Sequence, residues 1–393
     1  MAKQLKMIYA VRAILRWALL MGVALSGFVV GANLAQAQQT CAYVNDNLPN
    51  GNTVEGYSVT ATTVHVEPVA TGGSGSLTND SPFIGTPLIA IAPGTNHLYA
   101  SDSGSNDIAL FDIDSSTCNL ALVANFPAEG SSLFGLGIAI SQDGKFLYAS
   151  NADRQSTLVV FAINSDGSLG NSVQTVSLPA NPSSLAVTPN GKFLILTLPT
   201  TQKQVQSYAI NASTGRLALA SSLTTLAAVD GIAIDPHSKF VYVGNGGEND
   251  LAAVQVIQIG QGGKLSYISN VVFNGTNNPA VIPGASNCLL LSANGKLLFF
   301  TNQATAQVTS LNVDALTGGL SLNSIASDGG GLDEPSQLAA SPTRGLLFTG
   351  DFNTLGTPGM GVLRANANGT LKSLGTLPLT LEAPAISIAA VTF

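Results

Sequence analysis

Acidic side chains in short loops rich in glycine and serine are the groups of this sequence best suited to chemistry. The stretch "SDSGSND" places Asp102 and Asp107 in one loop, and "NGGEND" places Glu248 and Asp250 in another. Carboxylate oxygens at this spacing can bind Ca²⁺ or the polar groups of a small ligand. Neither loop has the spacing of an EF-hand, and aspartate is also a common turn residue. We therefore treat these four carboxylates as candidate ligand-binding groups and expect no resident metal or cofactor, with Ca²⁺ left open.

Two further candidates are a glycine-rich loop and a rare cation. In "DGGGLDEPS" (residues 328–336), three consecutive glycines precede Asp333 and Glu334, which gives a flexible segment with paired acids. Arg154 stands in "NADRQS", a loop in which basic residues are otherwise scarce. In an enzyme, Asp333 or Glu334 would activate water and Arg154 would contact an anionic group.

The first 37 residues have the organisation of a signal peptide. Basic residues occur at four positions between 3 and 16, residues 17–30 are apolar, and Ala35 and Ala37 give the small-x-small pattern of a cleavage site. The alternative is an uncleaved anchor helix, for which the apolar core is short. We expect residues 38–393 to form one mature domain outside the cytoplasm, periplasmic or secreted, without membrane insertion.

The composition excludes several classes of protein. Charged residues make up 9% and hydrophobic residues 45%, which is unlike a disordered chain. Without the signal, 11 basic and 22 acidic residues remain, a net charge of −11, so nucleic acid and anionic membranes are not expected partners. No C-x-x-C or paired Cys/His spacing occurs, which excludes a structural zinc site.

A short pattern recurs seven times along the chain. "GKFLYASN" (residues 144–151) has close copies in "GKFLILTL", "SKFVYVGN" and "GKLLFFTN", and looser copies in "TNHLYASD", "RGLLFTGD" and "CAYVNDN". Alignment on the central residue gives seven anchors 47 to 57 residues apart: Tyr43, Tyr99, Tyr148, Ile195, Tyr242, Phe299 and Phe348. A period of this length indicates one supersecondary unit used seven times.

Each repeat has the pattern of four short strands. In residues 182–224, "SSLAVTP" and "KFLILTL" are buried strands joined by "NGK", which favours a type I′ turn. "QVQSYAI" alternates as a half-exposed third strand should, and "LALASSL" is the fourth. Four-stranded antiparallel units in a ring are propeller blades. We expect each anchor to wedge between blades, and the Asn or Asp that ends the second strand to bond local backbone.

The two ends of the chain fit a closed ring. Tyr43 lies near the start of the mature chain, so its repeat lacks a first strand, whereas "PAISIAAVTF" (residues 384–393) matches a first strand without a hairpin after it. We predict an all-β, seven-bladed β-propeller whose C-terminal strand completes the N-terminal blade. Such closure removes exposed sheet edges.

These motifs resemble the YVTN-repeat propellers and, within them, exported members of the lactonase-like, 6-phosphogluconolactonase-like seven-bladed family. "CAYVNDN", "HLYASD", "KFLYASN" and "KFVYVGN" look like the Tyr-Val-x-Asn signature, and "NDNLPNGNTVEGYSV" looks like the opening of exported members. The resemblance covers about residues 38–393. It implies the fold, whereas the family's activities range from sugar-phosphate lactonases to a muconate cycloisomerase. The cycloisomerase members use a histidine for which we find no matching position.

Charges are expected to separate onto the two faces of the ring. Loops joining second to third and fourth to first strands contain 14 acidic residues but only Arg154 and Lys203 as cations. A phosphate needs clustered cations or a helix N-terminus, so a phosphorylated substrate is disfavoured. Histidine, the usual general base near neutral pH, is limited to His65, His97 and His237, all predicted away from this face. The loop acids can also serve only to keep the protein in solution.

Cysteines offer one structural link. Cys41 begins the second strand of the first blade, and Cys118 lies in the turn between the third and fourth strands of the next blade. A disulfide between them would pin the N-terminal segment if their Cα atoms approach within about 7 Å. Cys288 begins a buried strand and is expected to be a free thiol.

Two functions remain open. The first is a monomeric binding or scaffold propeller that holds a small neutral or cationic ligand, or a partner protein, on its acidic face. The second is a lactone hydrolase acting on a neutral lactone. An acid, Arg154 and a polar residue converging near the ring centre would favour the second, and a centre of serine, asparagine and aliphatic groups would favour the first.

Overall fold

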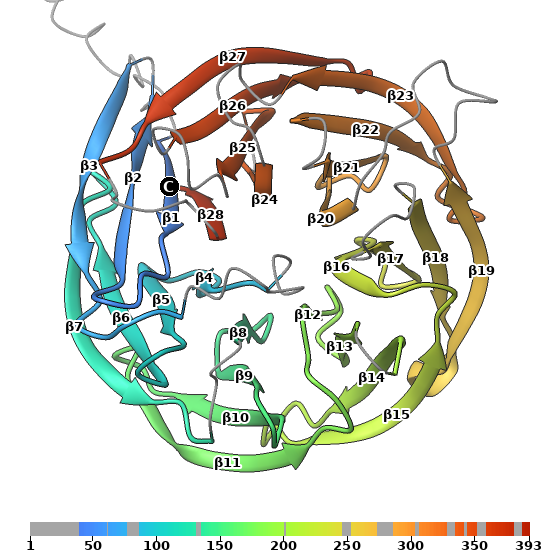
Figure 1. Cartoon of the computed structure of the whole chain (residues 1–393), viewed down its shortest axis with the longest axis horizontal. Coiled ribbons are helices and arrows are strands. Elements are labelled where there is room, and N and C mark those ends of the chain that lie inside the picture. Colours follow the sequence, from blue (N-terminus) through green and yellow to red (C-terminus); the bar gives the residue numbers. More distant parts are fainter. Residues whose placement is uncertain are drawn as a thin grey trace, which may run out of the picture. The chain divides into compact units, whose positions relative to one another are not determined.

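A computed structural model describes residues 39–60, 62–76, 86–130, 135–199, 202–245, 253–272, 286–302, 306–327, 335–341, 344–351, 359–380 and 387–393. They form seven four-stranded antiparallel sheets arranged as the blades of a ring (Figure 1). The predicted all-β, seven-bladed propeller is confirmed. The predicted signal peptide lies outside the described residues. Within the described residues, no helix is long and apolar enough to cross a bilayer.

The blades follow one another along the chain, and each runs from an inner to an outer strand. Blade 1 contains β28 (Ser387–Thr392), β1 (Thr40–Asn45), β2 (Thr53–Val59) and β3 (Thr63–Ala70). Blade 2 contains β4 (Ile89–Ile91), β5 (His97–Asp102), β6 (Asp107–Ile113) and β7 (Leu120–Pro127). Blade 3 contains β8 (Gly135–Ile140), β9 (Phe146–Ala152), β10 (Thr157–Ile163) and β11 (Leu169–Ser177). Blade 4 contains β12 (Leu185–Val187), β13 (Phe193–Leu198), β14 (Gln204–Ile210) and β15 (Leu217–Thr224).

The remaining blades repeat this order. Blade 5 contains β16 (Val229–Ile234), β17 (Phe240–Asn245), β18 (Ala253–Ile259) and β19 (Leu265–Val272), with the short 3₁₀ turn η1 (Gln261–Gly263) before β19. Blade 6 contains β20 (Ser286–Leu291), β21 (Leu297–Asn302), β22 (Gln307–Val313) and β23 (Leu320–Ser327). Blade 7 contains β24 (Pro335–Ala340), β25 (Leu346–Asp351), β26 (Gly359–Ala365) and β27 (Leu371–Pro378).

In blade 4 all four predicted strands are found, but the type I′ turn is wrong. The turn is closed by a 2.8 Å hydrogen bond from the Gly191 N–H to the Thr188 carbonyl. Only Gly191 has a positive φ there, 68°. Pro189 stands at the first central position, and its ring fixes φ near −65°, which a type I′ turn cannot accept.

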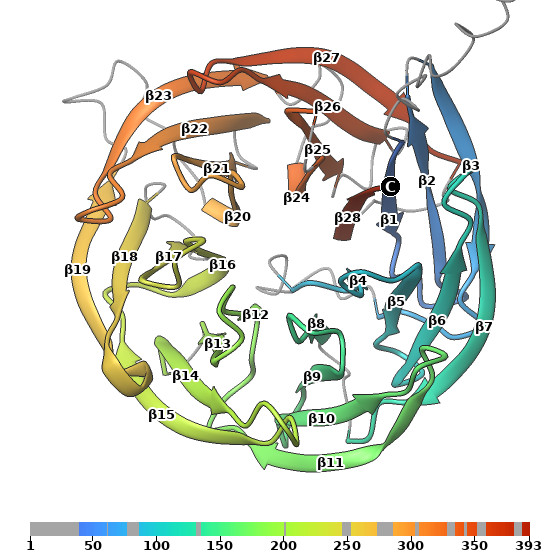
Figure 2. The same cartoon turned by 180° about the vertical axis from the view of Figure 1, so that it is seen from behind.

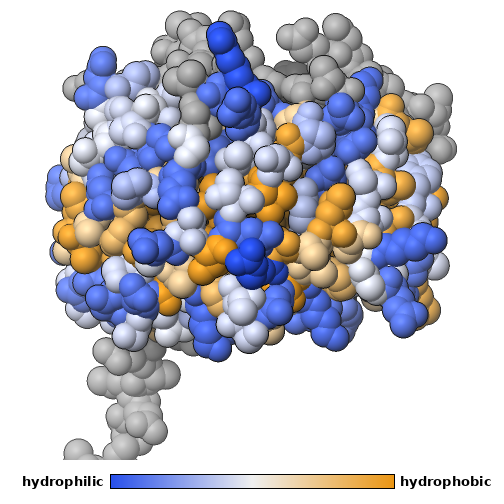
Figure 3. Space-filling model, turned by 90° about the horizontal axis from the view of Figure 1, so that it is seen from below, coloured by the Kyte–Doolittle hydropathy of each residue, from blue (hydrophilic) through white to orange (hydrophobic). Residues whose placement is uncertain are grey.

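The predicted half-exposure of the third strand is also wrong. In β14, Gln206 is 4% and Ser207 0% exposed, because β15 covers the strand and neighbouring blades cover its faces. The outer strand β15 carries the alternation instead, and Leu219 on it is exposed. Figure 3 shows apolar residues scattered among polar ones on one side of the ring.

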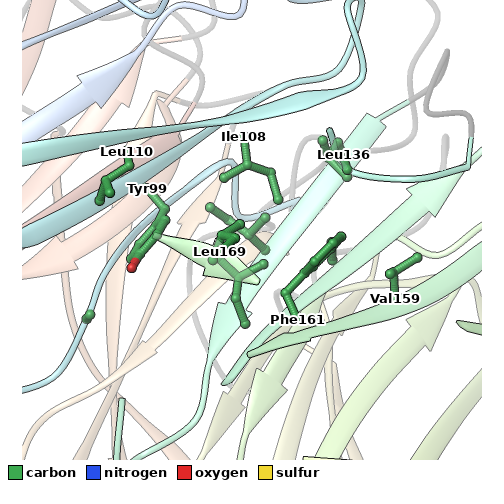
Figure 4. Packing of buried hydrophobic residues seen from close by; sticks show 12 residues of the cluster. Tyr99, Ile108, Leu110, Leu136, Val159, Phe161 and Leu169 are labelled. Atoms are coloured by element: carbon green, nitrogen blue, oxygen red, sulfur yellow. The ribbon is translucent and has the colours of Figure 1, made fainter. Parts of the chain in front are cut away.

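The core consists of apolar layers between adjacent blades. In the layer between blades 2 and 3 the labelled side chains are Tyr99, Ile108, Leu110, Leu136, Val159, Phe161 and Leu169 (Figure 4). All seven anchors are at most 2% exposed, so they wedge between blades as predicted. Burial of these side chains is the main favourable term that holds neighbouring blades together.

The tyrosine anchors also donate hydrogen bonds to the next blade. The Tyr43 hydroxyl donates to the Cys118 carbonyl at 2.7 Å, and the Tyr99 hydroxyl donates to the Gly167 carbonyl at 2.6 Å. Both carbonyls lie in turns between third and fourth strands. The signature tyrosine therefore links each of these blades to its neighbour as well as filling space.

Two blades without a tyrosine anchor replace the lost hydroxyl. Ser207 lies directly opposite Ile195, and Ser310 lies directly opposite Phe299. Each serine donates a 2.6 Å hydrogen bond to the equivalent turn carbonyl of the following blade. The inter-blade hydrogen bond is thus kept in these blades, but its donor is a serine of the third strand instead of a tyrosine of the second strand.

A disulfide replaces a repeated contact between blades 1 and 2. Two residues before the anchor, Phe146 packs on Gly215 of the next blade so closely that a Cβ there would collide with its ring. The equivalent residues between blades 1 and 2 are Cys41 and Cys118, which form a disulfide with a Cα–Cα distance of 5.6 Å. Cys118 has φ 66° where Gly215 has 70°, a conformation that costs a non-glycine residue about 1 kcal/mol.

The ring closes through its two ends, as predicted. Strand β28 pairs with β1 along the whole of both strands, from Thr40 opposite Thr392 to Asn45 opposite Ser387 (Figures 1 and 2). Arg344 of blade 7 strengthens the same junction, because its guanidinium donates to two backbone carbonyls of blade 1 at 2.6 and 2.8 Å.

Candidate ligand-binding face

The loop face is the end of the ring formed by loops between second and third strands and between fourth and first strands. Its described acids are Asp46, Asp102, Asp107, Glu129, Asp153, Asp230 and Asp351, and its described cations are Arg154 and Lys203. Three of these acids, Asp46, Asp102 and Asp230, are at most 1% exposed. The opposite end mixes lysines and arginines with turn aspartates such as Asp114, whose pKa is lowered chiefly by a hydrogen bond from the Ser116 hydroxyl. Among described residues, the acidic excess therefore lies on the loop face.

The structure brings Asp102 and Asp107 together. Asp102 ends β5, Asp107 begins β6, and the two are directly paired across the strands. Asp102 is fully buried, and its Oδ1 accepts hydrogen bonds from Asn52 Nδ2 (2.6 Å) and Thr71 Oγ1 (2.7 Å). The predicted bond to local backbone is thus wrong for Asp102, because blade 1 supplies its donors. Asp102 Oδ2 has no hydrogen-bond partner.

A glycine-rich segment of blade 1, residues 71–76, closes over this pair. A Cβ on Gly73 would collide with Asp102 Oδ2 and lie 2.6 Å from Asp107 Oδ1, so only glycine fits. The segment is fixed to blade 2 by a 2.8 Å hydrogen bond from the Gly104 N–H to the Ser74 carbonyl. The two carboxyl groups consequently meet in a partly enclosed site between blades 1 and 2.

Burial dominates the electrostatics of this pair. Removal from water raises the pKa of Asp102 to about 7, and the neighbouring Asp107 carboxyl adds to the rise. The hydrogen bonds from Thr71 and Asn52 favour the charged form but do not outweigh burial. A carboxyl with this pKa suits general acid–base chemistry, yet a fully buried side chain cannot touch a substrate directly.

The other candidate residues are not brought to this pair. Arg154 follows β9 in blade 3, is exposed, and makes no ion pair with any described acid. Glu248, Asp250, Asp333 and Glu334 lie outside the described residues. Of the predicted site, the described part of the chain therefore assembles only Asp102 and Asp107.

The three histidines lie away from this pair. His237 is exposed in the turn between β16 and β17, at the end opposite the loop face. His65 on the outer strand β3 bonds the buried Glu55, and His97 Nδ1 lies 2.9 Å from Asp112 at the end opposite the loop face. Neither is positioned as a free general base beside Asp102 and Asp107.

Sequence reasoning missed the polar residues at the loop-face ends of the inner strands. Ser183 donates to Asp230, which joins blades 4 and 5. Ser387 donates to Gln337 Oε1 at 2.7 Å, and Gln337 Nε2 donates to the Thr86 carbonyl at 2.5 Å, which joins blades 7, 1 and 2. The available signal was a polar residue one or two positions before an apolar residue near the start of these inner strands, as in Ser183 before Leu185 and Gln337 before Leu338.

Cys288 begins the inner part of blade 6 and is a free thiol. Burial raises the pKa of this thiol to about 12. A thiol in that state is a poor nucleophile, so the centre of the ring gains no reactive cysteine from it.

A family of known proteins has the same architecture. The family "Lactonase, 7-bladed beta-propeller" matches residues 135–229 and 218–331, and the chain belongs to that family. No curated protein matches the sequence.

Solved structures resemble the whole ring at low sequence identity. A putative 6-phosphogluconolactonase from Bacteroides fragilis is 16% identical, with 92% of this chain and 100% of that chain covered and a TM-score of 0.69. One from Bacteroides uniformis is 15% identical, with 91% and 100% covered and a TM-score of 0.70. A periplasmic gluconolactonase from Pseudomonas aeruginosa is 17% identical, with 90% and 99% covered and a TM-score of 0.69. At these identities the likeness shows the fold alone.

Proposed function

We propose that this lactonase-family propeller is an exported, monomeric binding protein that holds a small neutral or cationic ligand on its acidic loop face. The observation that carries the proposal is the charge of that face, where seven described acids lie with only Arg154 and Lys203 as cations, and where Asp107, Glu129 and Asp153 are at least partly exposed. Carboxylates accept hydrogen bonds from sugar hydroxyls and attract amines. A protein partner with a basic surface is the other occupant that this charge would accept.

The same charge disfavours a phosphorylated ligand. A phosphate dianion needs several Arg or Lys side chains or a helix N-terminus. The two described cations of the loop face are outnumbered by acids that would repel it, and no α-helix is found among the described residues. The likeness to putative 6-phosphogluconolactonases therefore concerns the fold of this chain, and we do not extend it to the ligand.

A lactone hydrolase is the second candidate, and membership of the lactonase family favours it. In this reaction a loop carboxylate, Asp333 or Glu334, would take a proton from water as the water oxygen attacks the lactone carbonyl carbon. Arg154 would stabilise the resulting oxyanion. The ring C–O bond then breaks, the alkoxide takes up the proton, and the product is a hydroxy acid.

A thermal-shift and hydrolysis assay tests both candidates on protein expressed from the full-length coding sequence. The probes are glucono-1,5-lactone, glucose, spermidine and 6-phosphogluconate. We expect a neutral or cationic probe to raise the melting temperature and 6-phosphogluconate to have no effect; stabilisation by 6-phosphogluconate alone would overturn the proposal. Release of acid from the lactone, lost in Glu334→Gln and retained in Glu129→Gln, would instead establish the hydrolase.

A further inference from the structure

The end of the ring opposite the loop face has an uneven distribution of charge. This turn end is formed by the turns between first and second strands and between third and fourth strands. Its exposed acids in blades 2 and 3 are Asp112, Asp114, Asp143 and Asp166. Its exposed cations in blades 4–7 are Lys192, Arg216, Lys264, Lys296, Arg364 and Lys372. In the described part of blades 4–7, Asp314 is the only exposed acid of the turn end.

Some cations of the turn end are held by the fold, and others are not. Arg216 Nη1 donates to the Val173 carbonyl at 2.8 Å, and Lys239 Nζ donates to the Leu316 carbonyl at 2.8 Å. Five side chains make no hydrogen bond or ion pair with any described residue, namely those of Lys192, Lys264, Lys296, Arg364 and Lys372. We call these five residues the basic sector.

Two cations of the basic sector lie directly opposite each other. Arg364 of β26 pairs with Lys372 of β27 across the two strands, and both are exposed. Like charges in this arrangement destabilise a sheet. The equivalent pairs of blades 2, 4, 5 and 6 are Asp112 with Ala121, Ala209 with Ala218, Gln258 with Ser266, and Asn312 with Ser321. Of these five blades, blade 7 alone holds a repulsion at this position, and a bound anion would relieve it.

The other lysines of the basic sector lie where neighbouring blades pack together. Gly263 of blade 5 lies so close to the Phe193 ring of blade 4 that a Cβ there would collide with it. Lys264 follows this glycine and Lys192 precedes this phenylalanine. The two lysines therefore lie at the same junction, between blades 4 and 5.

Lys296 lies beside the charged pair of blade 7 in the same way. A Cβ on Gly369, in the turn between β26 and β27, would collide with Leu297 of blade 6, which follows Lys296. Asp314 interacts with a different cation. Its pKa is lowered chiefly by the hydrogen bond from the Leu316 N–H, and Lys239 adds to the effect. The junction between blades 6 and 7 thus holds three cations of the basic sector.

We propose that the basic sector binds a linear polyanion, and that this polyanion is an acidic polysaccharide. Lysine and arginine attract carboxylate and sulfate groups, and cations at two separate junctions suit a chain with repeated charges better than one small anion. The protein as a whole is acidic, with a net charge of −7. At about 0.1 M salt, however, exposed charges more than about 10 Å apart are largely screened, so the local charge decides.

The acids of blades 2 and 3 argue against a membrane as the partner. A flat anionic bilayer on the turn end would also meet these four exposed carboxylates, which would repel it, whereas a chain can follow blades 4–7 alone. The choice of a polysaccharide over a nucleic acid rests on the export included in the proposed function.

Binding of labelled heparin and polygalacturonate to protein expressed from the full-length coding sequence tests the basic sector at about 0.1 M salt. We expect both polymers to bind, added salt to weaken them, and neutral dextran not to bind. Arg364→Gln with Lys372→Gln should weaken binding roughly threefold to tenfold. This variant should melt no lower than the unaltered protein, because the repulsion is removed.

A matched control removes the same charge outside the basic sector. Lys145 is paired with Asp143 in blade 3, and Lys203 lies on the loop face. Lys145→Gln with Lys203→Gln should therefore leave the affinity for both polymers unchanged. If the blade 7 variant fails to fold, Lys192→Gln with Lys264→Gln tests the other junction.

Three results would overturn the proposal. The first is no binding of either polymer, and the second is equal weakening by the basic-sector variant and the control. The third is tighter binding to phosphatidylglycerol vesicles than to the polymers, which would make a membrane the partner. Because none of the five cations lies on the loop face, failure here does not count against the ligand proposed for that face.

Discussion

The hydroxyl of the signature tyrosine should stabilise the ring only where it reaches the next blade. Tyr99→Phe removes a buried 2.6 Å hydrogen bond to the Gly167 carbonyl. A buried hydrogen bond of this kind contributes about 1 kcal/mol to the free energy of unfolding. Because the variant also leaves the carbonyl oxygen unpaired, we expect it to lower the free energy of unfolding by about 1–3 kcal/mol. For a ring of this size each kcal/mol corresponds to roughly 1 °C in melting temperature. We therefore expect Tyr99→Phe to melt about 1–3 °C lower.

Tyr148 provides the matched control. It is the equivalent anchor of blade 3 and equally buried, but its hydroxyl has no hydrogen-bond partner. Tyr148→Phe should be neutral or slightly stabilising, because it removes a buried hydroxyl that is not satisfied. Equal destabilisation of the two variants, measured by calorimetric melting at one scan rate, would refute the inter-blade role of the hydroxyl.

Three further changes test the ring and its charged pair. Removing residues 384–393 deletes β28, the strand that pairs with β1. We therefore expect the shortened protein to aggregate in size-exclusion chromatography or to melt without cooperativity by circular dichroism. A monomeric product that melts cooperatively would argue against closure of the ring through β1. The double variant Cys41→Ser with Cys118→Ser should lower the free energy of unfolding by about 2–5 kcal/mol. The double variant Cys41→Phe with Cys118→Gly restores the phenylalanine–glycine contact seen between other blades, so it should recover part of the lost stability. Identical urea midpoints for the two double variants would contradict this. Because burial raises the folded-state pKa of Asp102 to about 7, the folded protein binds this proton more tightly than the unfolded chain does. The stability that this proton contributes is therefore fully present below about pH 4 and is lost as the pH rises through about 7. Urea unfolding across that range should show this loss in the unaltered protein but not in Asp102→Asn, and coincident profiles would exclude a raised pKa.

The repeat was enough to predict the blades because each one carries the same alternation of apolar strand and glycine turn. Closure followed from the same pattern, since the sequence ends on a first strand that lacks its hairpin. The errors arose where neighbours decide the outcome. The polar residues of β14 match a half-exposed strand locally, but Gln206 and Ser207 are buried by elements distant in sequence.

The site was less predictable because it is assembled across blades. The sequence places Asp102 and Asp107 in one loop but does not show that Asn52, Thr71 and Gly73 of the previous blade enclose them. The cysteine pair did carry a readable signal. Cys118 stands in the turn where blades 3 to 7 have a glycine with positive φ, so a cysteine there requires a specific reason.

The most direct test of the proposed function is a calorimetric titration of the protein with glucono-1,5-lactone and with 6-phosphogluconate at low and moderate salt. We expect the neutral ligand to bind with little dependence on salt, and the phosphorylated ligand not to bind at either salt concentration, because the loop face is acidic. Tight, salt-sensitive binding of 6-phosphogluconate would contradict the charge argument on which the proposed function rests.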